Sequence, residues 1–249
     1  MDIIYKYSII LILGFALIVF IILFFISAPY GKFSRKGWGP AIKSKWAWMI
    51  MEFPSPALIF IFFITSEQKN IPQLVFLIVW LSHYLLRTFM YPFTQSGKQK
   101  PFPLIIVLMA VFFNCLNGLV NGYGVFYLNS YSNSWLVSWQ FIAGFLIFIN
   151  GFAINKSADE TLRQLRYKNP GDYIIPQGWL FNYISCPHYL GELVEWAGWG
   201  LMTWSIAGLT FFIFTFANLF PRAIASHKWY QATFPDYPKK RKAVIPFII

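Results

Sequence analysis

The residues that could carry chemistry are concentrated between positions 155 and 196 of this 249-residue chain. This stretch holds five acids and four bases, whereas the rest of the chain is nearly free of carboxylates. Its second half is apolar enough to enter a bilayer, yet it contains His188, Glu192 and Glu195. Ionisable groups at membrane depth are costly and usually face a cavity, a partner or a substrate. We therefore expect a functional site here, although the bases after Asp159 also fit a solvated interfacial loop.

Part of this stretch has the spacing of a helix. Asn155, Asp159, Leu162 and Arg166 recur at intervals of three and four residues, so they share one helix face, with Arg163 beside it. Such a face could bind ribose hydroxyls and phosphates, because guanidinium forks match phosphate geometry. No GxGxxG follows a strand and no Walker motif occurs, which excludes the usual nucleotide folds. If a nucleotide binds, the helices themselves must hold it.

A second group of polar residues lies earlier in the chain. Glu52 is near the start of one apolar segment, and His83 and Tyr84 are inside the next. A phenol held by an acid inside a helix bundle can donate a hydrogen bond to a substrate carbonyl. The alternatives are a helix-terminal carboxylate and an ordinary interfacial tyrosine.

The composition is that of a polytopic membrane protein. The chain is 57% hydrophobic and only 12% charged, with a mean hydropathy of +0.54, whereas soluble domains are about 25% charged. Neither cysteine belongs to a metal-binding motif, and the three histidines form no HExxH pair, so we expect no metal. The net charge of +11 is better explained by membrane topology and an anionic ligand than by nucleic acid.

Seven segments are apolar enough to be membrane spans, and the sixth is irregular because of its Gly and Pro. When all seven cross, the basic residues outside the spans collect on one face, Lys98 and Lys100 included and only Lys6 and Lys69 excepted, as the positive-inside rule requires for the cytoplasmic side. We therefore predict an all-α integral membrane protein with seven transmembrane helices, the N-terminus outside and the C-terminus cytoplasmic. Residues 1–249 form one domain without repeats or linkers, and the predicted spans are 7–26, 46–64, 71–93, 102–121, 135–151, 178–202 and 204–220.

Several motifs in the right order resemble the steroid 5α-reductase family. The C-terminal part of that family is similar to PQGWLFNYISCPHYLGELVEWAGWGLMTWS and PRAIASHKWYQATFPDYPKKRKAVIPFII, and its N-terminal half to MEFPSPA and HYLLRTFMYPF. The resemblance covers nearly everything after position 46. It implies that the N-terminal half lies mainly on the substrate side and that residues 150–249 bind the cofactor. We expect a monomeric bacterial homologue in the inner membrane, or an endoplasmic reticulum protein if the chain is eukaryotic.

The resemblance also implies a reaction. The family uses NADPH to reduce the 4,5 double bond of 3-oxo-Δ4-steroids to 5α-3-oxosteroids, by hydride transfer to the β-carbon of the enone. Glu52 and Tyr84 match the pair that holds the 3-keto oxygen, where a donor is needed because negative charge builds up there. The matching cofactor-side positions are Trp48, Arg87, Asn155, Asp159, Arg163, Arg166, Tyr173, Asn182, Glu192, Arg222, His227 and Tyr230.

Three positions depart from the mammalian pattern, namely Met51, Ile174 and His188, where those enzymes have Gln, Arg and Asn. These changes bear on cofactor contacts and on the exact steroid. Other readings stay open at this point: a reductase of another conjugated lipid, such as a trans-2-enoyl thioester or a polyprenal, an isoprenylcysteine methyltransferase-like enzyme, or a non-catalytic lipid- or nucleotide-binding membrane protein. A transporter would show inverted repeats and paired broken helices, and the sequence contains neither.

Overall fold

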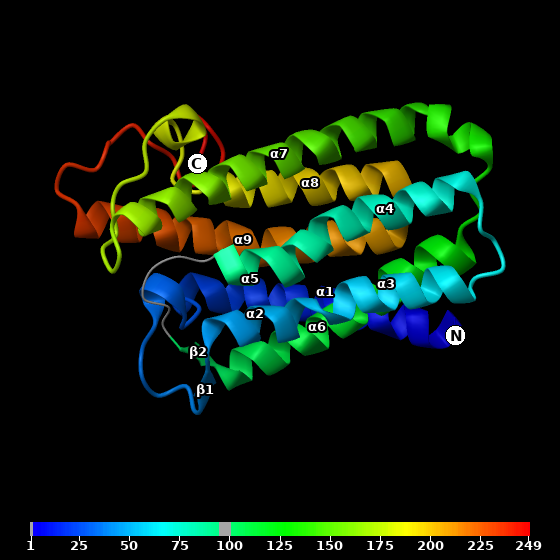
Figure 1. Ribbon diagram of the computed structural model, residues 1–249, viewed down its shortest axis with the longest axis horizontal. Helices are drawn as coiled ribbons and strands as arrows, with labels where there is room; N and C mark the ends of the chain where they lie inside the picture. The colour runs from blue at the N-terminus through cyan, green and yellow to red at the C-terminus, as the bar shows by residue number, and fades with distance from the viewer. Residues whose placement is uncertain (1, 95–100) are drawn as a thin grey trace.

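The protein is a bundle of long helices with very little other regular structure (Figure 1). The computed structural model describes residues 2–94 and 101–249, so Lys98 and Lys100 of the predicted cytoplasmic loop lie outside the described residues. In chain order the α-helices are α1 (Asp2–Phe25), α2 (Ser44–Glu52), α3 (Pro54–Thr65), α4 (Ile71–Leu85), α5 (Tyr91–Thr94), α6 (Leu104–Tyr123), α7 (Trp139–Lys168), α8 (Pro187–Thr203) and α9 (Ile206–Thr233).

Short segments join or extend these helices. Two five-residue π-helical turns, Leu86–Met90 and Gly124–Leu128, continue α4 and α6. Two strands, β1 (Ala41–Ile42) and β2 (Phe102–Pro103), pair antiparallel. Single 3-10 segments lie at Gly31–Phe33, Asn133–Val137 and Trp179–Asn182. Apart from one two-residue ribbon, the described part of the chain is therefore all-α, as its apolar segments predict.

Side-chain caps set the start of three long helices. The side-chain oxygens of Asn70, Ser138 and Ser205 each accept a hydrogen bond from the backbone N–H three residues further on, at 3.0 to 3.2 Å. Each cap satisfies a backbone donor that the first helical turn leaves free. The caps begin α4, α7 and α9 at the right-hand end of the bundle in Figure 1.

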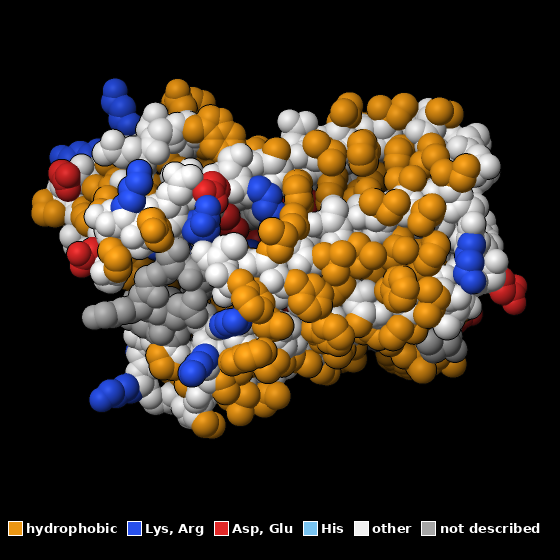
Figure 2. Space-filling view, in the orientation of Figure 1, with side chains coloured by type: hydrophobic (Ala, Val, Ile, Leu, Met, Phe, Trp, Pro, Cys, Tyr) orange, Lys and Arg blue, Asp and Glu red, His pale blue; other side chains and the backbone are white. Residues whose placement is uncertain are grey.

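The outer surface of the bundle is suited to lipid. On the face shown in Figure 2, large apolar side chains cover the middle and right of the molecule, whereas most of the visible Lys and Arg side chains lie toward the left-hand end. Apolar surface of this extent indicates contact with a membrane rather than with water. The chain is an integral membrane protein. Within residues 2–94 and 101–249, six helical segments are long and apolar enough to cross a bilayer: Asp2–Phe25, Ser44–Thr65, Ile71–Thr94, Leu104–Leu128, Trp139–Lys168 and Ile206–Thr233.

The segment 178–202, predicted as the sixth span, is helical mainly from Pro187 onward. Gly178 has a φ of +89°, the short 3-10 segment follows, and α8 then runs for 17 residues. Pro187 suits the first turn of α8, because a helix has no use for the N–H that proline lacks there. At 1.5 Å per residue α8 is about 25 Å long, somewhat less than a hydrocarbon core of roughly 30 Å.

Helices α7 and α8 pack closely because glycines lie at their contact. A Cβ added at Gly144 or Gly151 of α7, or at Gly191 or Gly198 of α8, would collide with a backbone nitrogen of the facing helix. In each helix the two glycines are seven residues apart, which places both on the same face. The two helices therefore form one closely packed unit, and this unit carries several polar residues of the site.

The segment after α9 folds back onto the beginning of α8. The backbone N–H of Ser185 donates to the carbonyl of Lys242 at 2.8 Å. The Ser185 hydroxyl lies 2.6 Å from both His227 Nδ1 and the Tyr237 hydroxyl. The C-terminus is held beside the start of α8, at the opposite end of the bundle from the N-terminus (Figure 1).

Candidate functional site

Two adjoining cavities lie inside the bundle. The first has a volume of about 560 Å³ and the second about 480 Å³, both within the range of small-molecule sites. The first is bordered by polar residues of α7, α8, α9 and the loop after α1, and the second by mainly apolar residues of α1, α4, α6 and α9. They meet where their linings share Tyr30, Trp48, Arg87, Glu192 and Arg222.

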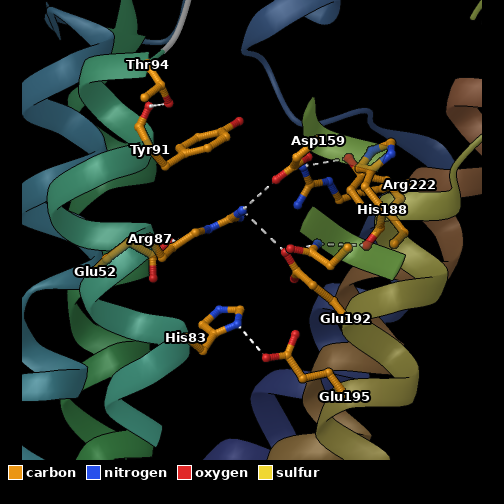
Figure 3. A network of polar contacts seen from close by, with 12 residues as sticks. Glu52, His83, Arg87, Tyr91, Thr94, Asp159, His188, Glu192, Glu195 and Arg222 are labelled. Carbon is orange, nitrogen blue, oxygen red and sulfur yellow. Dashed lines mark hydrogen bonds and ion pairs between the residues drawn. The ribbon is translucent and has the colours of Figure 1, made fainter. Parts of the chain in front are cut away.

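Arg87 is the charged centre of this junction (Figure 3). Its Nε lies 3.5 Å from Glu52 Oε1, and its Nη1 lies 3.3 Å from Glu192 Oε1 and 3.9 Å from Asp159 Oδ2. The guanidinium also lies over the ring of Trp48, 4.8 Å from its centre. All four charged side chains are between 14% and 19% exposed. The Arg87 guanidinium thus forms ion pairs with carboxylates of α2, α7 and α8, and water screens these pairs only weakly.

A local change in helix geometry positions Arg87. α4 is regular as far as Leu85, and the chain then takes the wider π-helical turn Leu86–Met90. Such turns shift the direction of side chains relative to a continuous α-helix and are frequent at functional sites. The turn separates Tyr84 from Arg87 in direction, so that Tyr84 lines only the second cavity whereas Arg87 lines both.

Further cations line the first cavity. Arg222 Nη2 donates to the Tyr189 hydroxyl at 3.1 Å, and the Lys32 ammonium lies 4.3 Å from the centre of the Tyr230 ring. Burial lowers the pKa of Lys32 to about 8, and the neighbouring guanidinium groups of Arg166 and Arg222 act in the same direction. An anion bound here would reduce the repulsion among these groups. The first cavity is therefore suited to phosphate.

Helix α7 contributes the polar face expected from its spacing. Asp159, Leu162 and Arg166 all line the first cavity, and Tyr173 follows from the loop after α7. Burial raises the pKa of the Tyr173 phenol, which keeps it protonated as a hydrogen-bond donor. Asp159 Oδ2 and His188 Nδ1 are buried without a hydrogen-bond partner among the described residues. Buried polar atoms are normally bonded, so these two are available to a ligand.

The second cavity is mainly apolar and contains Tyr84. The Tyr84 ring is only 3% exposed, and it stacks on Trp80 at 5.0 Å and contacts Trp196 at 5.7 Å. This packing fixes the ring and hence the position of its hydroxyl. Glu52 lines the same cavity, so the two predicted catalytic residues face one space. The Glu52 carboxylate pairs with Arg87.

A buried pair lies beside these residues. His83 Nδ1 is 2.8 Å from Glu195 Oε1, and the two side chains are 5% and 0% exposed. His83 lines the second cavity, and its ring packs against Tyr84 and Trp196 at 5.1 and 4.7 Å. The pair joins α4 to α8 at the wall of the second cavity (Figure 3).

The structure brings together most of the residues predicted for the site. Trp48, Arg87, Glu192 and Arg222 line both cavities. Asp159, Arg166, Tyr173 and Tyr230 line the first, and Glu52 and Tyr84 the second. The three departures from the mammalian pattern also border the cavities: Met51 the second, and Ile174 and His188 the first.

Four residues predicted to bind the cofactor line neither cavity. Asn155 is buried behind it and donates to the carbonyl of His188 at 3.0 Å. Arg163 forms a bidentate pair with Glu160, with both bonds at 2.6 Å. The other two support local backbone structure: the Asn182 side chain accepts from the N–H of Gly178, and His227 contacts Ser185.

Sequence reasoning did not single out several residues that the structure places at the site. Lys32 belongs to a basic loop that we interpreted as a topology signal, although its half-buried side chain lines the first cavity. Tyr30 and Tyr189 flank Arg222 at 5.1 and 5.2 Å. Asn114 of α6 lines the second cavity, and an asparagine inside an apolar segment was a signal that could have been used.

Fold and site together define a membrane protein in which a cationic, polar cavity opens onto an apolar one. Comparisons with known proteins place the chain in a family. Residues 100–249 match the family model described as 3-oxo-5-alpha-steroid 4-dehydrogenase.

Curated relatives span nearly the whole chain. It is 44% identical to steroid 5-alpha-reductase DET2 of Arabidopsis thaliana over 92% of this chain and 90% of that protein. It is also 44% identical to steroid 5-alpha-reductase DET2 of Gossypium hirsutum, over 98% of this chain and 97% of that protein. The 3-oxo-5-alpha-steroid 4-dehydrogenase 1 of Bos taurus is 37% identical over 93% of this chain and 92% of that protein. The chain belongs to the steroid 5α-reductase family and is an oxidoreductase.

Proposed function

We propose that the protein reduces the 4,5 double bond of 3-oxo-Δ4-steroids to 5α-3-oxosteroids with NADPH as the reductant. The observation that carries this proposal is the junction of the two cavities. A cationic cavity suited to a dinucleotide and an apolar cavity containing Tyr84 share Arg87 and Glu192 in their linings. Ligands in the two cavities would meet at that junction, as a transfer between them requires.

The first cavity fits NADPH by the chemistry of its donors. Lys32, Arg166 and Arg222 suit the phosphates, because cations held near one another gain from a bound anion. Asp159 Oδ2 and His188 Nδ1 are buried and make no hydrogen bond within the described chain, so they suit the hydroxyl and amide groups. The rings of Tyr30, Tyr173 and Tyr230 provide aromatic surface for its bases. When bound, NADPH supplies the hydride, and the protein supplies orientation and a dry cavity.

The second cavity fits a steroid, which is flat and apolar. Its lining includes Phe113, Trp196 and Phe211, and Tyr84 and Glu52 supply polar groups for the ketone. Addition of hydride to the β-carbon moves negative charge onto the ketone oxygen, so a hydrogen-bond donor placed there stabilises the transition state. We assign this role to Tyr84, with Glu52 and Arg87 fixing the polar end of the cavity. The reaction also consumes one proton at the α-carbon.

The membrane arrangement belongs to the same proposal. We infer seven spans with the N-terminus outside and the C-terminus cytoplasmic, in which α8 is the additional span. α8 is joined to α9 through Trp204 and the capping residue Ser205, and it packs along α7 through the glycine contacts. Cytoplasmic NADPH would then reach the first cavity directly. A site built entirely within one chain supports a monomer. We place this monomer in a bacterial inner membrane, or in the endoplasmic reticulum if the chain is eukaryotic.

The test is reduction by purified protein in detergent. We expect NADPH oxidation with 3-oxo-Δ4-steroids and a steroid product heavier by two hydrogens, and no oxidation without substrate. The matched panel contains trans-2-enoyl thioesters and polyprenals. Oxidation with one of these and not with steroids would replace the proposed substrate by another conjugated lipid. No oxidation with any of them, while NADPH still binds, would indicate a protein that binds without reducing.

A further inference from the structure

A buried histidine of the second cavity has one ring nitrogen engaged and one free. Nδ1 of His83 lies 2.8 Å from Glu195 Oε1, and the two side chains are 5% and 0% exposed. The other nitrogen, Nε2, makes no hydrogen bond within the described chain and is not among its fully enclosed unbonded atoms. The ring lines the second cavity, whereas Glu195 lies behind it and lines neither cavity. Nε2 is therefore the nitrogen that a ligand in this cavity can reach.

The His83 ring lies beside the group assigned to the ketone. It is 5.1 Å from the Tyr84 ring, and Trp196 packs against both, 4.7 Å from His83 and 5.7 Å from Tyr84. In Figure 3 His83 lies below Arg87, with Nδ1 directed toward Glu195. The α-carbon of a 3-oxosteroid is two bonds from the ketone oxygen. A ketone held by Tyr84 therefore brings the α-carbon near the His83 ring.

The pair formed by His83 and Glu195 can hold a proton for the cavity. With two protons on the pair, the first lies between Nδ1 and Oε1, and the second is on Nε2. The alternative is a proton on Glu195 Oε2, but that oxygen is buried and makes no hydrogen bond within the described chain. A hydroxyl left there without an acceptor would cost free energy. The two-proton pair therefore presents an N–H to the second cavity.

The other ionisable groups around Tyr84 are less suited to give a proton. Glu52 and Glu192 lie 3.5 and 3.3 Å from the Arg87 guanidinium, and a carboxylate paired with a cation has no proton to give. Arginine does not release its proton in proteins. Tyr84 is used at the ketone oxygen, so His83 is the acid that remains for the α-carbon.

We propose that His83 is the general acid that protonates the α-carbon, and that Glu195 positions it and shares a second proton with it. The inference rests on the proposed function. After hydride has reached the β-carbon, the electron pair of the enolate forms a C–H bond at the α-carbon, the Nε2–H bond breaks and the C=O double bond re-forms. Nδ1 keeps or takes the proton that it shares with Oε1, so the pair ends as a neutral imidazole donating to a carboxylate. Water restores the proton after the product has left.

The proton step can be measured without net reduction. With NADP⁺ and a 5α-3-oxosteroid in deuterated water, His83 Nε2 should remove a hydrogen from the α-carbon in the reverse of this step. We expect wild-type protein to exchange hydrogen for deuterium at the α-carbon faster than at the carbon on the other side of the ketone. NMR of the recovered steroid measures both positions, and the second position reports the background exchange in water.

His83→Asn removes the acid and keeps the contact behind it, because the asparagine amide nitrogen takes about the place of Nδ1 and nothing replaces Nε2. We expect exchange at the α-carbon and kcat to fall about 10²- to 10⁴-fold, the usual contribution of a general acid, with NADPH affinity unchanged. The proton step then limits the rate, so the isotope effect of deuterated NADPH on kcat should shrink toward one while that of deuterated water grows. A loss of packing alone would slow hydride transfer and leave the NADPH isotope effect.

Glu195→Gln tests the shared proton. Glutamine can hydrogen-bond to Nδ1 but cannot exchange a proton with it, so only an imidazolium without a carboxylate partner could then supply the proton. Burial disfavours such a cation, which persists only at acid pH. We expect the ratio of variant to wild-type kcat to approach one at acid pH and to fall roughly tenfold or more at alkaline pH. Taking the ratio at each pH removes the titration of the charged and titratable groups around the pair in both proteins: Glu52, Tyr84, Arg87, Lys156, Glu192 and Arg222.

The matched control is Asn121→Leu. Asn121 Oδ1 accepts from Trp199 Nε1 at 2.8 Å, so this buried bond has the same length and is also made to α8, but Asn121 lines neither cavity. The control should lose stability and keep the α-carbon exchange and both isotope effects of wild type.

An α-carbon exchange that survives His83→Asn, or a kcat ratio for Glu195→Gln that is flat with pH, would overturn the inference while steroid reduction stands. If His83→Asn does not fold, the Glu195→Gln ratio decides. Wild-type protein that reduces no steroid would overturn the proposed function and this inference with it.

Discussion

Replacing Arg87 by methionine should destabilise the protein strongly. Methionine keeps much of the apolar stem but removes the positive charge that three carboxylates share. Glu192, Glu52 and Asp159 lie 3.3, 3.5 and 3.9 Å from the guanidinium, and each is less than one fifth exposed. Removing one partner of a buried ion pair costs about 3 to 5 kcal/mol, because the remaining charge is uncompensated. We expect a loss of this size in the free energy of unfolding.

Equilibrium unfolding in mixed detergent micelles measures this loss. The matched control is Arg163→Met, which removes an arginine whose bonds to Glu160 are shorter, both at 2.6 Å, but whose side chain is 42% exposed. Exposed pairs contribute little, so the control should unfold almost as wild type does. Burial rather than distance then decides the outcome. An Arg87→Met variant as stable as this control would show that the three carboxylates do not depend on Arg87.

Three other predictions follow from the site. NADPH should bind most tightly below pH 8 and more weakly as the pH rises through about 8. The pKa of Lys32 is lowered to about 8, so its ammonium, which pairs with the phosphates, is lost as the pH rises through that value. Calorimetry at pH 7 and pH 9 measures the NADPH affinity, and Lys32→Met should remove its pH dependence. Single cysteines placed at Ser132 and Lys239 of a cysteine-free protein should be labelled from opposite sides of the membrane, and labelling from one side would contradict the seven-span topology. Tyr84→Phe should lower single-turnover steroid reduction about 10²- to 10³-fold with unchanged NADPH affinity, and near wild-type turnover would make the phenol structural.

Hydrophobic patterning predicted the helices because a bilayer imposes long apolar segments. Patterning does not show local departures from regular geometry. The π-helical turn at Leu86–Met90 contains Arg87, but an arginine in an apolar segment indicates a buried charge and does not indicate a change of helix geometry. The segment 178–202 was predicted to be irregular because of its Gly and Pro, and in the structure the irregular part precedes the start of α8 at Pro187. The paired glycines of α7 and α8, seven residues apart, were visible in the sequence and would have predicted the close contact.

For the site, helical spacing grouped Asp159 with Arg166 correctly, because residues three and four apart share a face. Spacing placed Arg166 on this face and Arg163 beside it, and in the structure Arg166 lines the first cavity whereas Arg163 pairs with Glu160. Family resemblance named Glu52 and Tyr84 but said nothing of the contacts behind them. The hydrogen bond from Asn114 to the Met51 carbonyl joins positions 63 residues apart in the sequence, and only the packing of α6 against the junction of α2 and α3 brings them together.

The central claim is that this chain transfers hydride from NADPH to the β-carbon of a steroid enone. The most direct measurement uses NADPH carrying deuterium in the transferable position of its nicotinamide ring, with purified wild-type protein and a 3-oxo-Δ4-steroid. We predict a 5α-3-oxosteroid with one deuterium at the former β-carbon and a solvent-derived hydrogen at the α-carbon. Absence of a reduced steroid, or a product whose β-carbon hydrogen comes from water, would contradict it.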